Sequence, residues 1–209
     1  MSSTSCLLIE CYHTCSNRGG RDTILKSAPF LSRPQKQWLS QGYYFWPESE
    51  YLAKIWGRDG YHNQYAIIKC NINLDINRLF DLAGRWIHNQ MLKDWLKSCE
   101  EKISDIEAKT QQPIQKPNAT VSGIIEFQRR LCRLSQSDEF FPFDAIRARD
   151  EPPKSVPTLP FVAGKQGILN AHPRIQLCLL PHAKNKISEK ELIFMIETND
   201  EWQASFFVS

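Results

Sequence analysis

Alternating apolar and polar side chains indicate where the strands of this chain lie. Over residues 64–75 an apolar side chain falls at every second position, which is the period of a strand with one buried face. A shorter apolar run over residues 6–12 predicts another strand, which carries His13 at its carboxyl end. Three further apolar segments predict strands at residues 174–180, 191–198 and 203–208.

Helical spacing dominates the middle of the chain. Apolar residues recur three and four positions apart from residue 77 to about residue 109, and again over residues 120–134, as on the buried face of an amphipathic helix. Residues 111–118 contain two prolines among polar residues, so a helix cannot continue through them. Residues 77–134 are therefore predicted to form a helical insertion, with a loop or hinge at residues 109–118.

Shorter elements surround these segments. Asn17 can cap a helix over residues 18–27, and Gly42 opens a strand that leads directly into a helix at residues 48–57. Residues 140–160 are rich in proline, so we expect an extended surface loop there, lying over a pocket.

Strands at both ends and helices between them predict a mixed α+β fold with a split, mostly antiparallel β-sheet. The chain has 209 residues, of which 42% are hydrophobic. This length suits one domain with a proper core. We therefore expect a single domain over residues 1–209.

Composition and motifs argue against membrane, disulfide-rich, zinc-binding and phosphate-loop proteins. No apolar run reaches 18 residues, and the first residues lack a secretory signal, so a cytosolic protein without a membrane partner is expected. The seven cysteines include no C-x-x-C pair, which indicates neither a disulfide framework nor a zinc site. The histidines show no metal-ligand spacing, and neither a G-x-S-x-G motif nor a glycine-rich phosphate loop occurs. A net charge of +3 permits a nucleic-acid partner without arguing for one.

Two short motifs suggest a chemistry. Gly42-Tyr43-Tyr44-Phe45-Trp46 follows Tyr12-His13-Thr14-Cys15 by about thirty residues. In order and spacing these motifs resemble the nicotinamide pocket of the ADP-ribosyltransferases, in the H-Y-E branch with diphtheria-toxin-like and poly(ADP-ribose) polymerase-like folds. The resemblance implies an ADP-ribosyltransferase-like sheet, NAD as the substrate and no metal. It assigns His13 to ribose hydroxyls, Tyr44 to the nicotinamide ring and the Thr14 backbone to the carboxamide.

The family's third residue is a glutamate that opens a late strand. The strand at residues 174–180 resembles that strand and has Gln176 at the glutamate's position. Glutamine can bond a ribose hydroxyl but cannot act as a base, which favours single transfer over chain elongation. Glu151 and Asp150 are alternative carboxylates. Thr14 is a second departure, because the family usually has glycine there.

Two more residues are candidates for NAD binding. Trp56, twelve positions after Tyr44, is placed to cover the other side of the nicotinamide, with Tyr51 as a competitor. Arg147 could grip the pyrophosphate, or could form a surface ion pair. Core packing is the alternative for each aromatic residue, and a polar position on a strand is the alternative for Gln176.

These features predict a mono-ADP-ribosyltransferase that resembles toxins of bacterial toxin–antitoxin and phage-defence systems, and they imply a neutralising antitoxin. The alternatives are a catalytically inactive relative that binds an NAD-like ligand or a partner, and a helical interaction module. A basic rim and nearby phenylalanines favour RNA or DNA over protein as the acceptor. The rim residues are Arg147, Arg149, Lys154, Lys165 and Arg174, and the phenylalanines are Phe140, Phe141, Phe143 and Phe161.

Overall fold

The structure is a computed structural model of the chain. It describes residues 5–33, 37–98, 103, 105, 107–109, 111, 120–150, 158–160, 168–170 and 173–196. The strands are β1 (Cys6–Ser16), β2 (Tyr43–Pro47), β3 (Tyr65–Asp75), β4 (Leu79–Asp81), β5 (Ala145–Asp150), β6 (Thr158–Pro160), β7 (Ile168–Asn170), β8 (Arg174–Leu179) and β9 (Ile187–Met195). The α-helices are α1 (Gly20–Ser27), α2 (Glu50–Gly60), α3 (Trp86–Lys97) and α5 (Val121–Ser135), and 3₁₀ turns cover Ile76–Arg78, Asp138–Phe140 and Pro181–Lys186.

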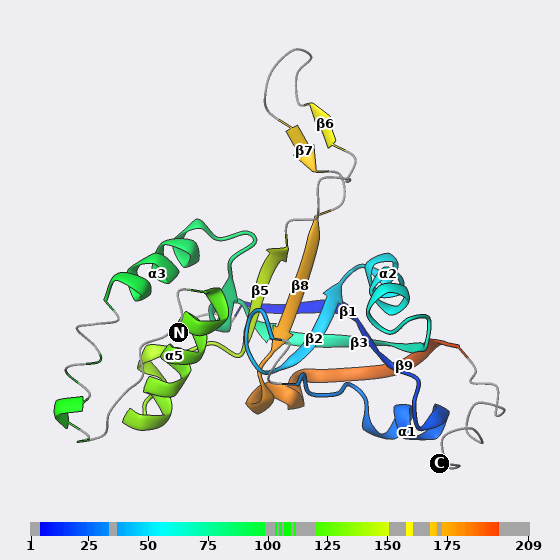
Figure 1. Cartoon of the computed structure of the whole chain (residues 1–209), viewed down its shortest axis with the longest axis horizontal. Coiled ribbons are helices and arrows are strands. Elements are labelled where there is room, and N and C mark those ends of the chain that lie inside the picture. The colour runs from blue at the N-terminus through cyan, green and yellow to red at the C-terminus, as the bar shows by residue number, and fades with distance from the viewer. Residues whose placement is uncertain are drawn as a thin grey trace, which may run out of the picture.

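Seven strands form one sheet in the order β4-β5-β8-β2-β1-β3-β9 (Figure 1). Neighbouring strands of this sheet are antiparallel except β4 and β5, which are parallel. Strands β6 and β7 form a separate antiparallel pair. The predicted mixed α+β class with a mostly antiparallel sheet is confirmed.

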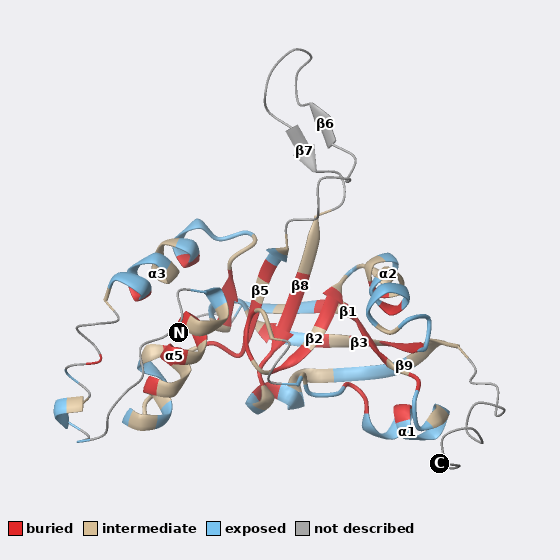
Figure 2. Ribbon diagram, in the orientation of Figure 1, coloured by how far each residue is buried: buried red, intermediate tan, exposed pale blue. Residues whose placement is uncertain are grey.

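Helices pack on both faces of this sheet (Figures 1 and 2). On one face, α3 and α5 bury Trp95 and Ile125 against β4, β5 and β8, and α2 buries Ala53 against β1 and β3. On the opposite face, α1 inserts the fully buried Ile24 between residues of β1 and β3. The first strand therefore alternates: Tyr12 faces α2, and Cys15 faces α1.

The sheet divides between β1 and β2. β1 pairs with β3 along its whole length, from Cys6 opposite Asp75 to Ser16 opposite Tyr65. With β2 it pairs only at Cys11–Pro47 and Tyr12–Trp46. Beyond Tyr12 the two strands have no further paired residues, so His13 of β1 and Tyr44 of β2 lie at the point where the strands separate. We call this region the β1–β2 split.

The predicted single helix over residues 77–109 is wrong at its start and in its length. A 3₁₀ turn and the short strand β4 come first, and α3 begins only at Trp86 and ends at Lys97. Leu79 and Phe80 are buried because β4 pairs with β5, a partner far along the chain. The apolar spacing of this segment fits a helix locally, and this long-range pairing overrides it.

The surface loop expected to begin at residue 140 is wrong over residues 145–150. These residues form β5, an interior strand between β4 and β8. Pro142 precedes the strand and interrupts no hydrogen bond within it. Residues 158–160 of the predicted loop form β6, and residues 151–157 lie outside the described residues.

Several predicted boundaries also move. β1 continues to Ser16, so His13 is not its last residue. Gly19 precedes α1, and Asn17 instead donates from its side chain to the Ile196 carbonyl at 2.7 Å. β9 begins earlier than predicted, and the strand expected at 203–208 lies outside the described residues. The helix expected at 120–134 is confirmed, with Thr120 as its cap.

Phe80 is the centre of the core beneath α3. It is 0% exposed, and its ring lies 4.9–5.7 Å from those of His88, Trp95, Phe141 and Phe143. Phe80→Ala should lower the free energy of unfolding by about 3–5 kcal/mol, because it leaves a cavity among these rings. Urea denaturation measures this loss.

Trp86→Ala, at the start of α3, is the control for Phe80→Ala. The Trp86 side chain is 74% exposed, so its loss should change the free energy of unfolding by no more than about 0.5 kcal/mol. Equal losses in the two variants would contradict the packing described for α3.

Candidate functional site

The three predicted catalytic residues lie on three neighbouring strands. His13 is on β1, Tyr44 on β2 and Gln176 on β8, and these strands are adjacent in the sheet. Tyr44 is paired with Cys178, two residues after Gln176. The three strands are neighbours, but the side chains divide between the two faces of the sheet. Tyr44 and Gln176 lie on the face of α3 and α5, whereas the His13 ring lies on the opposite face, 5.6 Å from that of Phe45.

His13 bridges the β1–β2 split. Its Nδ1 lies 2.8 Å from the Tyr44 carbonyl oxygen, and its Nε2 accepts a hydrogen bond from the Phe30 backbone N–H at 3.1 Å. Since Nε2 accepts, the proton of the neutral ring is on Nδ1 and is donated to Tyr44. Burial lowers the pKa of His13 to about 4, so the ring is neutral at neutral pH.

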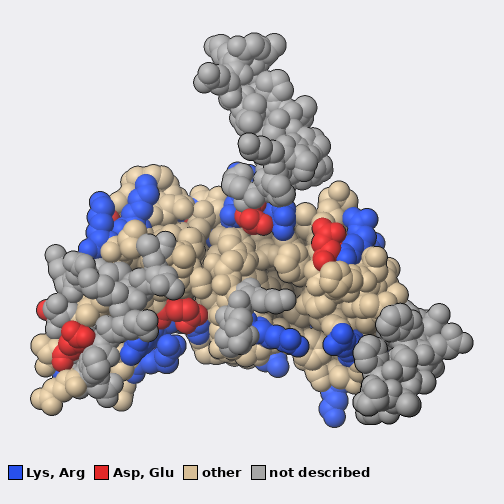
Figure 3. All heavy atoms as spheres, viewed as in Figure 1, with Lys and Arg blue, Asp and Glu red and all other residues tan. Residues whose placement is uncertain are grey.

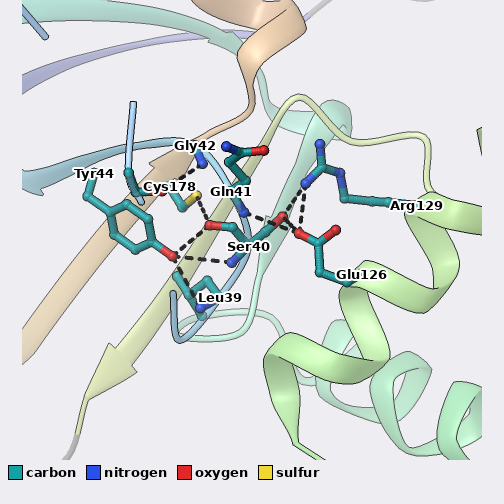
Figure 4. Close-up of polar contacts among 9 residues, drawn as sticks. Leu39, Ser40, Gln41, Gly42, Tyr44, Glu126, Arg129 and Cys178 are labelled. Atoms are coloured by element: carbon teal, nitrogen blue, oxygen red, sulfur yellow. Dashed lines mark hydrogen bonds and ion pairs between the residues drawn. The ribbon is translucent and has the colours of Figure 1, made fainter. Parts of the chain in front are cut away.

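The Tyr44 hydroxyl is held by the chain just before its own strand. It accepts from the backbone N–H groups of Leu39 and Ser40, both at 3.2 Å, and donates to the Ser40 carbonyl at 2.8 Å (Figure 4). Burial raises the pKa of Tyr44 well above its ordinary value. The hydroxyl is therefore a neutral group with a fixed orientation.

Gln176 is buried on the same face of the sheet as Tyr44. It is paired with Ala148 of β5, which belongs to the core beneath α3 and α5 together with Tyr44. Its Oε1 accepts a hydrogen bond from the Trp38 indole N–H at 2.8 Å. Gln176 thus already has a partner from the protein.

One segment supplies partners to all three residues. We define the α1–β2 connection as residues 28–33 and 37–42, the described chain between α1 and β2. Within it Phe30 bonds His13, Trp38 bonds Gln176, and Leu39 and Ser40 bond Tyr44. Its exposure is uneven, because Leu39 and Ser40 are 0% exposed whereas Phe30 is 37% exposed.

Helix α5 anchors this connection through Glu126 and Arg129. The Ser40 hydroxyl donates to Glu126 Oε1 at 2.5 Å, and the Gln41 backbone N–H donates to the same oxygen at 3.2 Å. Arg129 Nη1 donates to Glu126 at 2.9 Å and also to the Ser40 hydroxyl. Figure 4 shows the resulting network, in which a charged pair on α5 fixes the residues that hold Tyr44.

Thr14 of β1 contacts α2 through its side chain, whereas Trp56 and Tyr51 of α2 are exposed. The Thr14 hydroxyl donates to the Ala53 carbonyl of α2 at 2.9 Å, so its side chain is directed at the helix. Trp56 is 40% exposed and its ring lies 6.2 Å from that of Trp46, two residues after Tyr44. Tyr51, the competing residue, is 60% exposed.

Arg147 lies away from Tyr44 and Gln176. Two hydrogen bonds join its guanidinium to Asp81, from Nε to Oδ1 at 3.0 Å and from Nη2 to Oδ2 at 2.5 Å. The neighbouring Ala148 shares the face of Gln176, and adjacent strand residues point to opposite faces. Arg147 is predicted either to bind the pyrophosphate or to form an ion pair. In the structure it forms an ion pair with the Asp81 side chain, which is only 4% exposed.

Of the other predicted site residues, Asp150 forms an ion pair, and Phe141 and Phe143 are buried. Asp150 pairs with Arg174 at 3.2 Å, and Glu151 lies outside the described residues, as does Phe161. Phe141 and Phe143 are core residues, each 5% exposed. The prediction that these two rings stack on a base is wrong, because they already pack around Phe80.

Sequence reasoning missed the anchor of the site. Ser40 and Glu126 are 86 positions apart, and no local pattern connects them. Glu126 and Arg129 are three residues apart within a predicted helix, which is the spacing of an intrahelical ion pair. That spacing could have identified the pair, but not its partner.

Comparison of the chain with protein-family models, curated proteins and solved structures finds no match. The described residues contain no group of three or more histidine, cysteine, aspartate or glutamate side chains able to hold a metal ion. Nor does any helix among them have the length and apolar character needed to cross a bilayer. Two surface hollows, one beside Arg21 and β9 and one beside Asn73 and Lys186, include none of the predicted site residues.

The neutral His13 makes stability depend on pH. Its pKa is about 4 in the folded protein and about 6.5 in the unfolded chain. The unfolded chain therefore takes up the proton first as pH falls. The free energy of unfolding should be highest above about pH 6.5 and should fall by about 3 kcal/mol as the pH approaches about 4.

Urea denaturation of the parent and of His13→Gln over this pH range isolates the effect. The variant should be less stable throughout, with a weaker dependence on pH. His88, whose pKa burial also lowers, is present in both proteins and cancels in the difference. Identical pH dependence in the two proteins would show that His13 is not the buried neutral group described above.

Proposed function

We propose that the protein is an NAD-dependent mono-ADP-ribosyltransferase whose NAD site is the β1–β2 split. The observation that carries the proposal is the sheet order β8-β2-β1, which makes neighbours of Gln176, Tyr44 and His13. The separation of β1 from β2 beyond Tyr12 supports it further. A flat ring that enters between separating strands can meet His13 from one face and Tyr44 from the other.

The reaction is a glycosyl transfer. The bond between C1′ of the ribose and the nicotinamide nitrogen breaks, its electron pair stays with nicotinamide, and nicotinamide leaves as a neutral molecule. A nucleophilic atom of the acceptor bonds to C1′ and loses its proton. Because the leaving group needs little acid catalysis, the protein's contribution is orientation and exclusion of water.

In this scheme each residue has a positioning role. Tyr44 packs on the nicotinamide ring, Trp56 covers its other side, and the Thr14 backbone holds the carboxamide. His13 and Gln176 bond ribose hydroxyls. Since Gln176 cannot remove a proton, any base must be a carboxylate elsewhere, and Glu151 remains the predicted one.

Binding of NAD requires the α1–β2 connection to release two hydrogen bonds. These are the bond from Phe30 to His13 and the bond from Trp38 to Gln176. Each contributes about 1 kcal/mol net, so the cost of about 2 kcal/mol is one that NAD contacts can offset. The part of the connection that must move is partly exposed, whereas the fully buried Leu39 and Ser40 can stay in place.

A second candidate function is binding without turnover. Both ring nitrogens of His13 have backbone partners, and position 176 carries an amide in place of a carboxylate. A protein of this kind would hold an NAD-like ligand or a partner protein in the split. Turnover of NAD separates this candidate from the transferase.

The biological setting belongs to the same proposal. A compact transferase of this type would act in the cytoplasm as a toxin of a toxin–antitoxin or phage-defence system, with a protein antitoxin that neutralises it. Its acceptor would be RNA or DNA, with a protein acceptor as the alternative. Of the basic rim predicted around Arg147, both Arg147 and Arg174 are engaged with carboxylates, so the rim alone is a weaker argument for nucleic acid than the sequence suggested.

Incubation with NAD labelled on its adenylate part, in a cell extract, tests the proposal. The label should become covalently attached to a macromolecule, and nicotinamide should be released. Gln176→Ala should reduce the rate by about 10²-fold, because an interaction with the reacting ribose is lost. Tyr44→Ala should abolish transfer, and Gln176→Glu should retain transfer or raise NAD hydrolysis.

Asn73→Ala is the matched control, because Asn73 is an exposed amide on β3 outside the predicted site. It should transfer label at the parental rate. Parental rates for Tyr44→Ala and Gln176→Ala would remove the split as the catalytic site. NAD binding without label transfer or nicotinamide release in the parent would favour the second candidate.

A further inference from the structure

Helix α3 presents an aromatic and basic stripe to solvent. Trp86, Lys93 and Lys97 are all exposed. Lys93 follows Trp86 by seven positions, and Lys97 follows Lys93 by four. At 3.6 residues per turn, all three side chains lie on one side of the helix, over about three turns. We call these three residues the α3 stripe.

The opposite side of the helix is occupied by the core. His88 and Trp95 are buried in α3, and both rings pack against Phe80. The orientation of the helix is therefore fixed, and the α3 stripe points away from the sheet. Figure 2 shows exposed residues along the outer side of α3, and Figure 3 shows basic side chains gathered at this edge of the molecule.

Trp86 has the highest exposure among the large hydrophobic residues described, at 74%. Within the described part of the chain its ring has no aromatic or cationic neighbour and its indole N–H has no acceptor. The nearby aromatic residues Phe80, Trp95, Phe141 and Phe143 are instead in the core. An exposed indole between lysines offers a flat surface on which an unpaired base can stack.

The charge around Trp86 is positive. Arg85, Lys93 and Lys97 are exposed, and none forms an ion pair with another described residue. The single acid of the helix, Asp94, accepts a hydrogen bond from Gln90 at 3.1 Å. Three cations against one carboxylate favour an anionic ligand.

We propose that the α3 stripe binds single-stranded nucleic acid, with Trp86 stacking on an unpaired base and Lys93 and Lys97 contacting phosphates. Exposed aromatic rings combined with lysines are the usual means of binding single strands without sequence preference. A protein partner fits less well, because lysine is depleted at the centres of protein interfaces. In the proposed function this ligand is the acceptor, but its binding requires no NAD.

Fluorescence anisotropy with a labelled single-stranded oligonucleotide tests the proposal without NAD. Trp86→Ala should weaken binding roughly 5- to 150-fold, the loss expected for one base stack. The double variant Lys93→Gln, Lys97→Gln should also weaken binding. For the parent, raising the salt from about 50 to about 200 mM should weaken binding roughly 7- to 20-fold, as two or three phosphate contacts predict.

Lys26→Gln on α1 and Ile87→Ala on α3 are the matched controls, for charge and for exposed apolar surface. Both side chains are exposed and lie outside the α3 stripe, so both variants should bind like the parent. Circular dichroism should show the same fold in all variants, since the replaced side chains are exposed.

Parental binding by Trp86→Ala, or tighter binding of a duplex than of the single strand, would overturn the proposal. So would the absence of oligonucleotide binding by the parent, including the case in which a protein partner occupies the stripe. Oligonucleotide binding that depends on Trp86 in a protein without NAD turnover would leave this inference standing and would refute the transferase.

Discussion

A single neutral imidazole connects the parts of this fold that matter for its proposed chemistry. His13 bonds the carbonyl of Tyr44 on one side and the backbone N–H of Phe30 on the other. It does so where β1 and β2 cease to pair, so a side chain takes over a contact that a strand ladder would otherwise make. Burial keeps the ring uncharged, and a charged imidazole could not accept from Phe30.

The α1–β2 connection is fixed at one end and more exposed at the other. Leu39 and Ser40 are fully buried, and Ser40 is bonded to the ion pair of Glu126 and Arg129 on α5. Trp38 and Phe30 are only partly covered, and they hold Gln176 and His13. The same connection thus keeps Tyr44 in place and occupies the hydrogen-bonding groups of His13 and Gln176 that NAD would need. One segment therefore both orients Tyr44 and blocks the proposed NAD site.

The sequence predicted the elements with a clear period. The alternation over residues 64–75 is β3, and the helical spacing after Thr120 is α5. Family resemblance selected residues of three strands that the fold does make neighbours. The predictions of β3 and α5 depend on local periodicity, which is visible in a sequence, and the NAD site that the resemblance implies stays a prediction.

What the sequence did not predict depends on contacts between distant segments. β4 and β5 are strands because they pair with each other within the sheet, although each has a local pattern that favours another structure. Arg147 is bound to Asp81, 66 positions away, and so takes an ion-pair role that its own surroundings in the sequence cannot reveal. Likewise Phe141 and Phe143 are buried by α3 and β4, and no property of their own segment indicates this.

In the proposed function, NAD enters the β1–β2 split by displacing the exposed end of the α1–β2 connection. Nuclear magnetic resonance of ¹⁵N-labelled protein during an NAD titration tests it most directly. The Trp38 indole N–H and the Phe30 backbone N–H give up their bonds to Gln176 and His13 in this account, so both signals should shift together as NAD is added. The Trp86 indole should not shift. Unchanged Trp38 and Phe30 signals in the presence of NAD would contradict the account.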